Sequence, residues 1–223
     1  IGIYNVTVAG DTRFDRVGKI ADKARVLPVV EDFVAGGRAF VAGSTWQPDE
    51  ELLIRLMNAH PDMKFIVAPH EMDEKRIRDM LAAVRGGGVR YTEYGEADGG
   101  SGKQLLVIDT IGILSSVYGY GSYAYIGGGF GVGIHNTREA AGVGGAVVLG
   151  TKDGKLREVR GLIECGASRS ISSYDELAEW FDGLQSSPEH YEAAATAAGS
   201  YVRSHRGATN IILREIFAGR KEE

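Results

Sequence analysis

The sequence has few of the features that mark secreted, membrane or nucleic-acid-binding proteins. Its 223 residues contain one cysteine, Cys165, which excludes an internal disulfide and a cysteine-based metal cluster and fits a reducing compartment. No apolar run approaches the roughly 18 residues that span a bilayer, and no stretch resembles a signal peptide. We therefore expect a chain that is soluble as it stands.

An excess of positive charge is also missing. The chain has 25 Lys and Arg against 30 Asp and Glu, a net charge of -5, and no long basic block. The electrostatic footprint of a nucleic-acid binder is therefore lacking, and we expect no nucleic-acid partner.

Short apolar runs rich in β-branched and aromatic residues recur along the chain, and most are followed by a helical pattern. They are RAFVAGS, MKFIVAPH, GVRYTEY, QLLVID, SYAYIGG, AVVLG and ASRSI. Runs this continuous are typical of strands covered on both faces. The pattern predicts an α/β fold with a Rossmann-like parallel sheet and helices on both faces, as a single domain over residues 1–223. Residues 187–223 are predicted to form C-terminal helices.

Several local expectations follow from the same pattern. A helix is predicted to begin near Pro48, where the carboxylates of residues 49–51 suit a helix N-terminus, and a second helix to span Asp73–Val84 with Arg76 largely solvated. Cys165 is expected to be a small buried helix residue. Residues 4–8 are strand-like, and the chain opens at Ile1 in the middle of a pattern. We therefore expect a fragment whose N-terminal partner is missing.

In open parallel sheets, ligands bind at the carboxyl ends of the strands, and polar residues follow two of the predicted strands there. Ser44 and Thr45 precede a helix, so their hydroxyl groups suit an anion-binding site at the helix N-terminus. A simple N-cap explains the presence of these two residues equally well. Pro69 and His70 end another strand. The histidine can hydrogen-bond a base or a phosphate, or it can be merely structural.

Two further strand ends favour backbone contacts. The turn Ile111-Gly112-Ile113 can present backbone groups to a nucleobase, while Asp109, which ends the strand before it, can equally well be the N-cap of the next helix. In the stretch IGGGFGVGIHNTRE, Gly128 and Gly129 allow a sugar or phosphate to lie against the main chain.

The residues after this glycine-rich stretch are predicted to open a helix. Asn136 suits the cap position, Thr137 and Arg138 its first turn, and Glu139 completes an arrangement like a capping box. The Glu139 carboxylate can also accept two ribose hydroxyl groups. A helix cap alone is the simpler alternative.

The strand AVVLG, which ends at Gly150, precedes a basic segment. Lys155, Arg157, Glu158 and Arg160 are predicted to begin a helix there, and they suggest either an anionic ligand or a solvated helix face. No G-x-G-x-x-G follows the first strand, which disfavours a dehydrogenase, and no Asp-x-Asp motif argues for a metal. We expect neither a cofactor nor a metal.

As a set, these motifs resemble those of a known family. The sequence is similar to the C-terminal half of the 3-deoxy-D-manno-octulosonic acid (Kdo) transferases of lipid A assembly, from about Val6 to Phe217. The stretches that carry the resemblance are GSTW, IVAPHE, IDTIGILSSVYGYGSYAYIGGGF, GIHNTREAAGVGGAVVLG and KLREVRGLIECGAS. The resemblance implies a GT-B glycosyltransferase, in which two Rossmann-like domains face each other across a cleft, and it implies that this chain is the domain that binds CMP-Kdo.

The resemblance assigns roles position by position. Pro69 and His70 match a turn that contacts CMP, residues 111–113 match a turn near the nucleotide, and Ser44 and Thr45 match a G-S-T loop. Residues 136–139 match an H-N-P-L-E stretch, in which the glutamate contacts ribose and the helix N-terminus faces phosphate. Three departures leave the exact contacts open: His70 stands for a frequent Arg, Ile113 for a frequent Glu, and residues 137–138 for Pro-Leu.

The resemblance also implies which parts this chain lacks. The family inverts the anomeric centre of Kdo with a glutamate base from the N-terminal domain, so no catalytic residue is expected in this chain. That domain would also bring the lipid A precursor and the association with the cytoplasmic face of the bacterial inner membrane. We expect the chain alone to bind CMP but to transfer no sugar. The alternatives are a UDP-sugar-using GT-B transferase or epimerase domain and a non-catalytic nucleotide-binding module.

Overall fold

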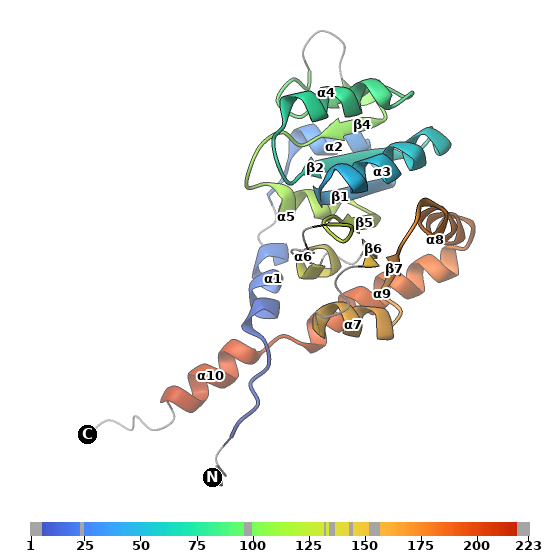
Figure 1. The fold of residues 1–223 in the computed structure, drawn as a ribbon. Helices are drawn as coiled ribbons and strands as arrows, with labels where there is room; N and C mark the ends of the chain where they lie inside the picture. Colours follow the sequence, from blue (N-terminus) through green and yellow to red (C-terminus); the bar gives the residue numbers. More distant parts are fainter. Residues whose placement is uncertain are drawn as a thin grey trace.

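The protein forms a doubly wound α/β domain. The computed structural model describes residues 6–22, 25–95, 100–131, 133, 137–142, 145–151 and 157–217. Within these ranges, seven strands form one sheet in the order β3-β4-β2-β1-β5-β6-β7, and every paired strand is parallel to its neighbour. The predicted fold class is therefore confirmed (Figure 1).

The strands coincide with the apolar runs of the sequence. They are β1 (Ala39–Thr45), β2 (Lys64–Pro69), β3 (Gly88–Arg90), β4 (Leu105–Val107), β5 (Tyr123–Ile126), β6 (Ala146–Gly150) and β7 (Ser168–Ile171). The central strands β1, β2, β5 and β6 are buried along almost their whole length, because helices cover both faces of the sheet. Successive residues of β1 alternate between two cores: Val41 faces one, and Phe40 faces the other.

The core that contains Val41 is covered by most of the helices. They are α1 (Thr12–Asp22), α2 (Pro28–Val34), α5 (Leu114–Val117), α6 (Thr137–Gly142), α7 (Arg157–Glu164) and α9 (Pro188–Ser204). The 3-10 turn η2 (Tyr118–Tyr120) adds the buried ring of Tyr118 to this core.

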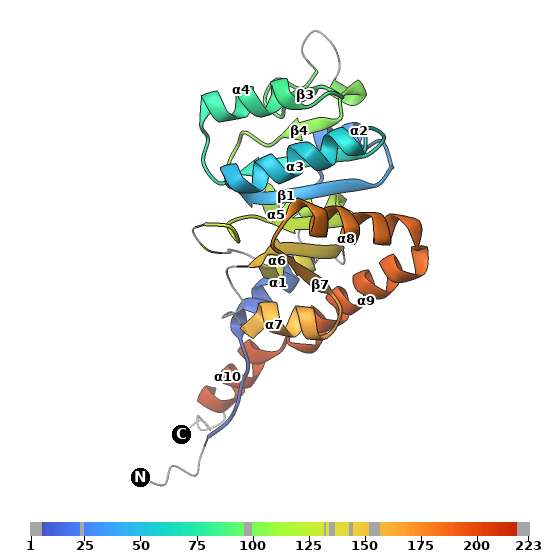
Figure 2. The same ribbon diagram turned by 45° about the vertical axis from the view of Figure 1, so that its right-hand side comes forward.

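The core that contains Phe40 is covered by three helices, α3 (Gln47–Ala59), α4 (Glu74–Ala83) and α8 (Tyr174–Ser186), which Figure 2 shows along this face. Their apolar stripes dock on the sheet, and Leu53, Leu56 and Met57 of α3 are fully buried. Aromatic rings fill the space between α8 and the sheet, where Phe181 packs against Phe40 and Tyr123.

The last helix, α10 (Ala208–Phe217), extends away from the sheet beside the segment that precedes α1 (Figures 1 and 2). Asp15 of α1 holds its start, because the carboxylate accepts hydrogen bonds from the backbone N–H groups of Gly207 and Thr209. These bonds lower the pKa of Asp15. The helical character predicted for the C-terminal tail is confirmed over residues 188–217.

Two local predictions are wrong. Residues 6–8 form no strand, and Val6 and Val8 are exposed, while Tyr4 lies outside the described residues. Cys165 is exposed rather than buried, because α7 ends at Glu164 and Gly166, with φ +75°, turns the chain back towards β7. The predicted helix starts near Pro48 and at Asp73 are confirmed, and the side chain of Asp73 caps α4.

Candidate nucleotide site

The carboxyl edge of the sheet has a topological switch point between β1 and β5. From β1 the chain continues through β2 on one side, whereas β5 and β6 lie on the other side. The helix that follows β1, α3, covers one face, and the helix that follows β5, α6, covers the opposite face. Open α/β sheets bind ligands outside the carboxyl ends of the strands at such a point, and we call this edge of the sheet the crevice.

The loop that leaves β1 lies on one side of this crevice. Ser44 adopts a left-handed conformation with φ +55°, which is uncommon for a residue with a Cβ. Thr45 is fully buried, and its hydroxyl donates to Oε1 of Glu50 over 2.9 Å. Thr45 therefore shapes the loop through its side chain, and Ser44 is the partly exposed member of the predicted pair.

The end of β2 lies against this loop. The backbone N–H of His70 donates to the carbonyl of Thr45 over 2.9 Å, and the imidazole stacks on the indole of Trp46 with 4.5 Å between the ring centroids. Pro69 is buried at the strand end, while His70 is exposed at the edge. The structure therefore brings two separate sequence motifs, G-S-T-W and A-P-H, into direct contact.

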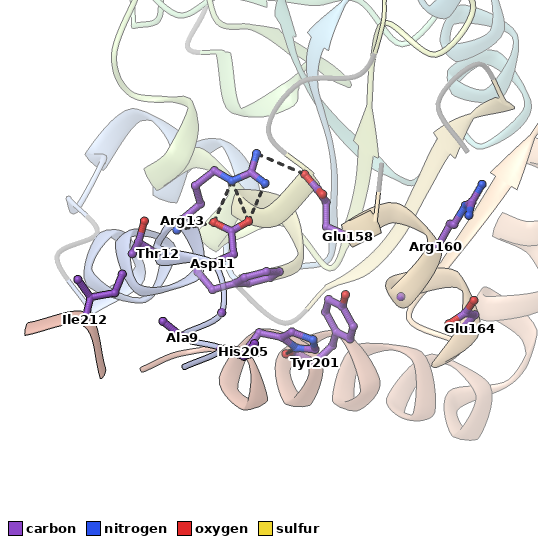
Figure 3. A pocket seen from close by; sticks show the side chains of 14 residues that line it. Ala9, Asp11, Thr12, Arg13, Glu158, Arg160, Glu164, Tyr201, His205 and Ile212 are labelled. Carbon is purple, nitrogen blue, oxygen red and sulfur yellow. Dashed lines mark hydrogen bonds and ion pairs between the residues drawn. The ribbon is translucent and has the colours of Figure 1, made fainter. Parts of the chain in front are cut away.

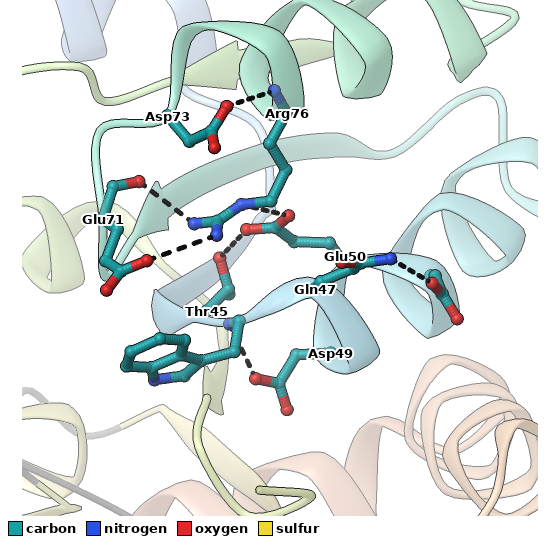
Figure 4. Close-up of polar contacts among 9 residues, drawn as sticks. Thr45, Gln47, Asp49, Glu50, Glu71, Asp73 and Arg76 are labelled. Atoms are coloured by element: carbon teal, nitrogen blue, oxygen red, sulfur yellow. Dashed lines mark hydrogen bonds and ion pairs between the residues drawn. The ribbon is translucent and has the colours of Figure 1, made fainter. Parts of the chain in front are cut away.

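Glu50 of α3 and Arg76 of α4 hold these two loops through a series of polar contacts (Figure 4). Glu50 accepts from Thr45 and lies 3.1 Å from Nε of Arg76, whose guanidinium also donates to the backbone carbonyl of Glu71 over 3.0 Å. Burial raises the pKa of Glu50, although the Arg76 charge opposes the shift. Arg76 was expected to be solvated, but its side chain is only 18% exposed because it reaches back to Glu50.

The glycine-rich stretch after β5 forms the other side of the crevice. The backbone N–H of Gly127 donates to the carbonyl of Gly43, and a Cβ on Gly127 would lie 2.3 Å from the carbonyl oxygen of Ser44. Gly128 has φ +95°, and a Cβ on Gly129 would collide with the backbone of Gly150. These glycines are therefore required where three strand ends meet.

The turn after β4 approaches the same edge. Ile111 is 88% exposed, Gly112 has φ +88°, and Ile113 is the N-cap residue of α5. The next residue, Leu114, packs against Gly43, which links this turn to the end of β1. Asp109 is not the cap of α5. Its carboxylate instead accepts hydrogen bonds from the backbone and the hydroxyl of Thr92.

Helix α6 starts in the predicted place. Glu139 lies in its first turn and is half-buried. Burial and the nearby Glu139 carboxylate raise the pKa of Tyr118. The hydroxyl of Tyr118 occupies the space that a Cβ on Gly43 would need. Asn136 lies outside the described residues, and Thr137 and Arg138 are described only as the start of α6. Their predicted contacts stay predictions.

Four residues that support this edge were not recognised as such from the sequence: Trp46, Asp49, Tyr118 and Tyr125. Asp49 was assigned only to the helix N-terminus, yet it is fully buried and receives hydrogen bonds from Trp46, Tyr125 and Gly128. The sequence offers only the run of three carboxylates at residues 49–51, which does not distinguish a buried carboxylate from a solvated one.

A separate cavity of about 1070 Å³ lies between the start of α1, α7 and the end of α9 (Figure 3). Arg13 pairs with Asp11 and approaches Glu158, and Arg160 lines the same cavity. Of the basic segment predicted from the sequence, Glu158 and Arg160 line this cavity. Lys155 and the side chain of Arg157 lie outside the described residues. None of the predicted nucleotide-site residues lines this cavity, so we place the candidate site at the switch point.

Two negative findings concern the described part of the chain. No group of three or more His, Cys, Asp or Glu side chains there is arranged to hold a metal ion. No helix there has the length and apolar character needed to cross a bilayer.

Comparisons with known proteins identify relatives of the chain. No protein-family model matches it. It is 29% identical over 171 residues to the mitochondrial "Probable 3-deoxy-D-manno-octulosonic acid transferase" of Arabidopsis thaliana, covering 72% of this chain and 38% of that protein. It is 25% identical over 225 residues to the 3-deoxy-D-manno-octulosonic acid transferase of Bordetella pertussis, covering 95% of this chain and 51% of that protein. The chain is similar in sequence to Kdo transferases.

Solved structures agree on the fold. The C-terminal CMP-Kdo-binding domain of WaaA from Acinetobacter baumannii superposes with a TM-score of 0.67 at 19% identity, covering 85% of this chain and 99% of that one. The UDP-GlcNAc 2-epimerase of Neisseria meningitidis gives a TM-score of 0.66 at 17% identity, covering 98% of this chain and 56% of the epimerase. Both matches show a shared GT-B fold.

The chain spans about half the length, or less, of these Kdo transferase relatives. The Kdo transferase motifs recognised in the sequence nevertheless fall together in space. The G-S-T loop, the Pro69-His70 turn and the glycine-rich stretch are adjacent at one edge of the sheet, joined by the backbone hydrogen bonds of His70 and Gly127.

Proposed function

We propose that this chain is the donor-binding domain of an inverting glycosyltransferase that transfers Kdo from CMP-Kdo to a lipid A precursor in lipopolysaccharide synthesis. The relationship to Kdo transferases supports the proposal, and so does the fold shared with a CMP-Kdo-binding domain. The observation that carries it is the meeting of the loops after β1, β2 and β5 at the switch point.

The chemistry of the crevice suits a nucleotide sugar. Glycines without a Cβ allow phosphate or sugar to approach the main chain, and the N-terminus of α3 faces the same edge. We propose that His70 and the turn at residues 111–113 contact the nucleotide, and that Glu139 accepts ribose hydroxyl groups. Backbone N–H groups and helix N-termini would stabilise the leaving phosphate without a metal.

The proposal assigns the remaining chemistry to another part of the full-length protein. A domain that precedes this one would supply the general base, the lipid acceptor surface and the association with the inner membrane. Helix α10 is the proposed contact between the two domains, because its residues Leu213, Ile216 and Phe217 are 46%, 59% and 51% exposed. The 223-residue chain is therefore expected to bind donor and to transfer no sugar.

Calorimetric titration of the chain with CMP, UDP and NAD⁺ tests the proposal. Preferential binding of CMP supports it. A preference for UDP would favour a UDP-sugar transferase or epimerase of the same fold, and the absence of nucleotide binding would favour an interaction module. A turnover assay with CMP-Kdo and a lipid A precursor tests the second statement, since activity of this chain alone would contradict it.

A further inference from the structure

Two neighbouring acids at the start of α3 are buried. Asp49 is 0% exposed and Glu50 is 3% exposed, although both lie in the first turn of a helix that begins at the surface edge of the sheet. A carboxylate near a helix N-terminus gains from the dipole while it is solvated, so burial adds a desolvation cost that contacts must offset. Glu50 has Thr45 and Arg76 as partners. Asp49 has a different set.

Both oxygens of Asp49 accept hydrogen bonds, and the three donors come from three segments of the chain. Oδ2 accepts from the backbone N–H of Trp46 over 2.8 Å and from the backbone N–H of Gly128 over 2.9 Å. Oδ1 accepts from the hydroxyl of Tyr125 over 2.6 Å. Burial and the Asp49 carboxylate raise the pKa of Tyr125, which keeps this hydroxyl protonated as a donor.

These bonds cross the switch point. Trp46 follows β1, while Tyr125 and Gly128 belong to β5 and the glycine-rich stretch after it. Gly128 has φ +95°, so it is the residue at which the chain turns out of the sheet. The carboxylate of Asp49 therefore sets the position of the glycine-rich stretch after β5 relative to the loop after β1.

Packing alone does not set the relative position of these two loops. Gly127 touches the backbone of Ser44 and Thr45 and donates a hydrogen bond to the carbonyl of Gly43, which holds the ends of β1 and β5 together but makes no contact with the N–H groups of Trp46 and Gly128. Without the Asp49 carboxylate, the N–H groups of Trp46 and Gly128 would both be left without their acceptor beneath the site.

We infer that Asp49 is a positioning residue for the nucleotide site, whose carboxylate holds the glycine-rich stretch after β5 against the loop after β1 in the arrangement that the nucleotide sugar requires. This inference rests on the proposed function for its ligand. It assigns to Asp49 no contact with the ligand itself.

The variants Asp49→Asn and Asp49→Ala test the inference in the 223-residue chain. Asparagine has one acceptor oxygen and no charge, so it weakens the bonds, while alanine removes them. Gln104→Ala is the matched control: Gln104 is 4% exposed and donates to the backbone carbonyls of Met57 and His60 at the opposite edge of the sheet. Loss of the Gln104 side-chain amide is expected to destabilise the fold without changing any contact of the loops at the crevice.

The readouts are the dissociation constant of CMP and the melting temperature. We expect CMP binding to weaken about tenfold or more in Asp49→Asn, equivalent to about 1.4 kcal/mol, and further in Asp49→Ala. Gln104→Ala should lower the melting temperature and leave CMP binding unchanged. If Asp49→Ala does not fold, Asp49→Asn decides. Wild-type affinity in a folded Asp49→Asn chain would overturn the inference.

Amide hydrogen exchange separates failure of the inference from failure of the proposed function. If the wild-type chain binds no CMP, the proposed function fails. The positioning role is then read from the exchange of residues 127–131, which we expect to be faster in Asp49→Asn than in wild type and unchanged in Gln104→Ala. Equal exchange in wild type and Asp49→Asn would overturn the positioning role.

Discussion

Replacement of Gly127 by alanine tests whether the loops after β1 and β5 must meet backbone to backbone. The added Cβ would lie 2.3 Å from the carbonyl oxygen of Ser44 and 2.6 Å from Cα of Thr45. Ordinary contact begins near 3.4 Å, so the two loops would have to separate by about 1 Å. Neither neighbour is the end of a flexible side chain, and the φ of Gly127 is not left-handed, so the effect is steric.

The magnitude follows from this geometry. Overpacking a core typically costs about 1–3 kcal/mol, and a clash with two backbone segments places Gly127→Ala near 3 kcal/mol. In a protein of this size, 1 kcal/mol corresponds to about 2–4 °C in melting temperature. We therefore expect the melting temperature to fall by about 6–12 °C and CMP binding to weaken, because the crevice widens.

The assay is thermal unfolding followed by circular dichroism, together with calorimetric titration of CMP. Gly131→Ala is the matched control, because it lies in the same glycine-rich stretch and no atom lies within 4 Å of the added Cβ. We expect that control to melt within about 2 °C of wild type, as surface substitutions usually do. Equal melting temperatures for Gly127→Ala and Gly131→Ala would refute the reasoning.

Three further predictions concern carboxylates. Glu139→Gln should weaken CMP binding without lowering the melting temperature, as measured by titration and thermal unfolding, and unchanged affinity would reduce Glu139 to a helix cap. Burial raises the pKa of Glu50 in the folded state, so its contribution to stability is present below the unfolded pKa and is lost as the pH rises through the folded pKa. Thermal unfolding from pH 4 to 8 should therefore show the stability of Glu50→Gln rising relative to wild type with pH, and a constant difference would contradict this. Asp15→Ala should speed proteolytic removal of α10, because it removes the acceptor for the N–H groups of Gly207 and Thr209, and cleavage at the wild-type rate would show that other contacts hold the helix.

Much of the fold could be predicted from the sequence. The central apolar runs became strands whose continuous apolar residues are buried by helices on both faces, and the starts of α3 and α4 follow from Pro48 and the cap Asp73. The predicted site residues at the ends of β1, β2 and β5 lie side by side, because parallel strands bring their carboxyl ends to one edge.

The failures have two physical origins. Cys165 is exposed because Gly166 ends the helix one residue earlier than the apolar pattern suggested. Arg76 is mostly buried because it pairs with Glu50, and Asp109 accepts a hydrogen bond from Thr92 instead of capping α5. The outcomes for Arg76 and Asp109 depend on partners far away in the sequence, which local periodicity and capping preferences do not contain, whereas the outcome for Cys165 follows from the adjacent Gly166.

The sequence by itself determined the class of the fold, the edge of the sheet at which the predicted site residues lie and the need for glycine after β5. These depend on hydrophobic periodicity and backbone conformation, which are local properties. Only the tertiary structure decided that Thr45 turns its hydroxyl inward to Glu50, and that Asp49 joins the loops on either side of the switch point. The sequence does not show whether a carboxylate is solvated or accepts hydrogen bonds from three buried donors. For Asp49, the packing of β1 against β5 decides between these two environments.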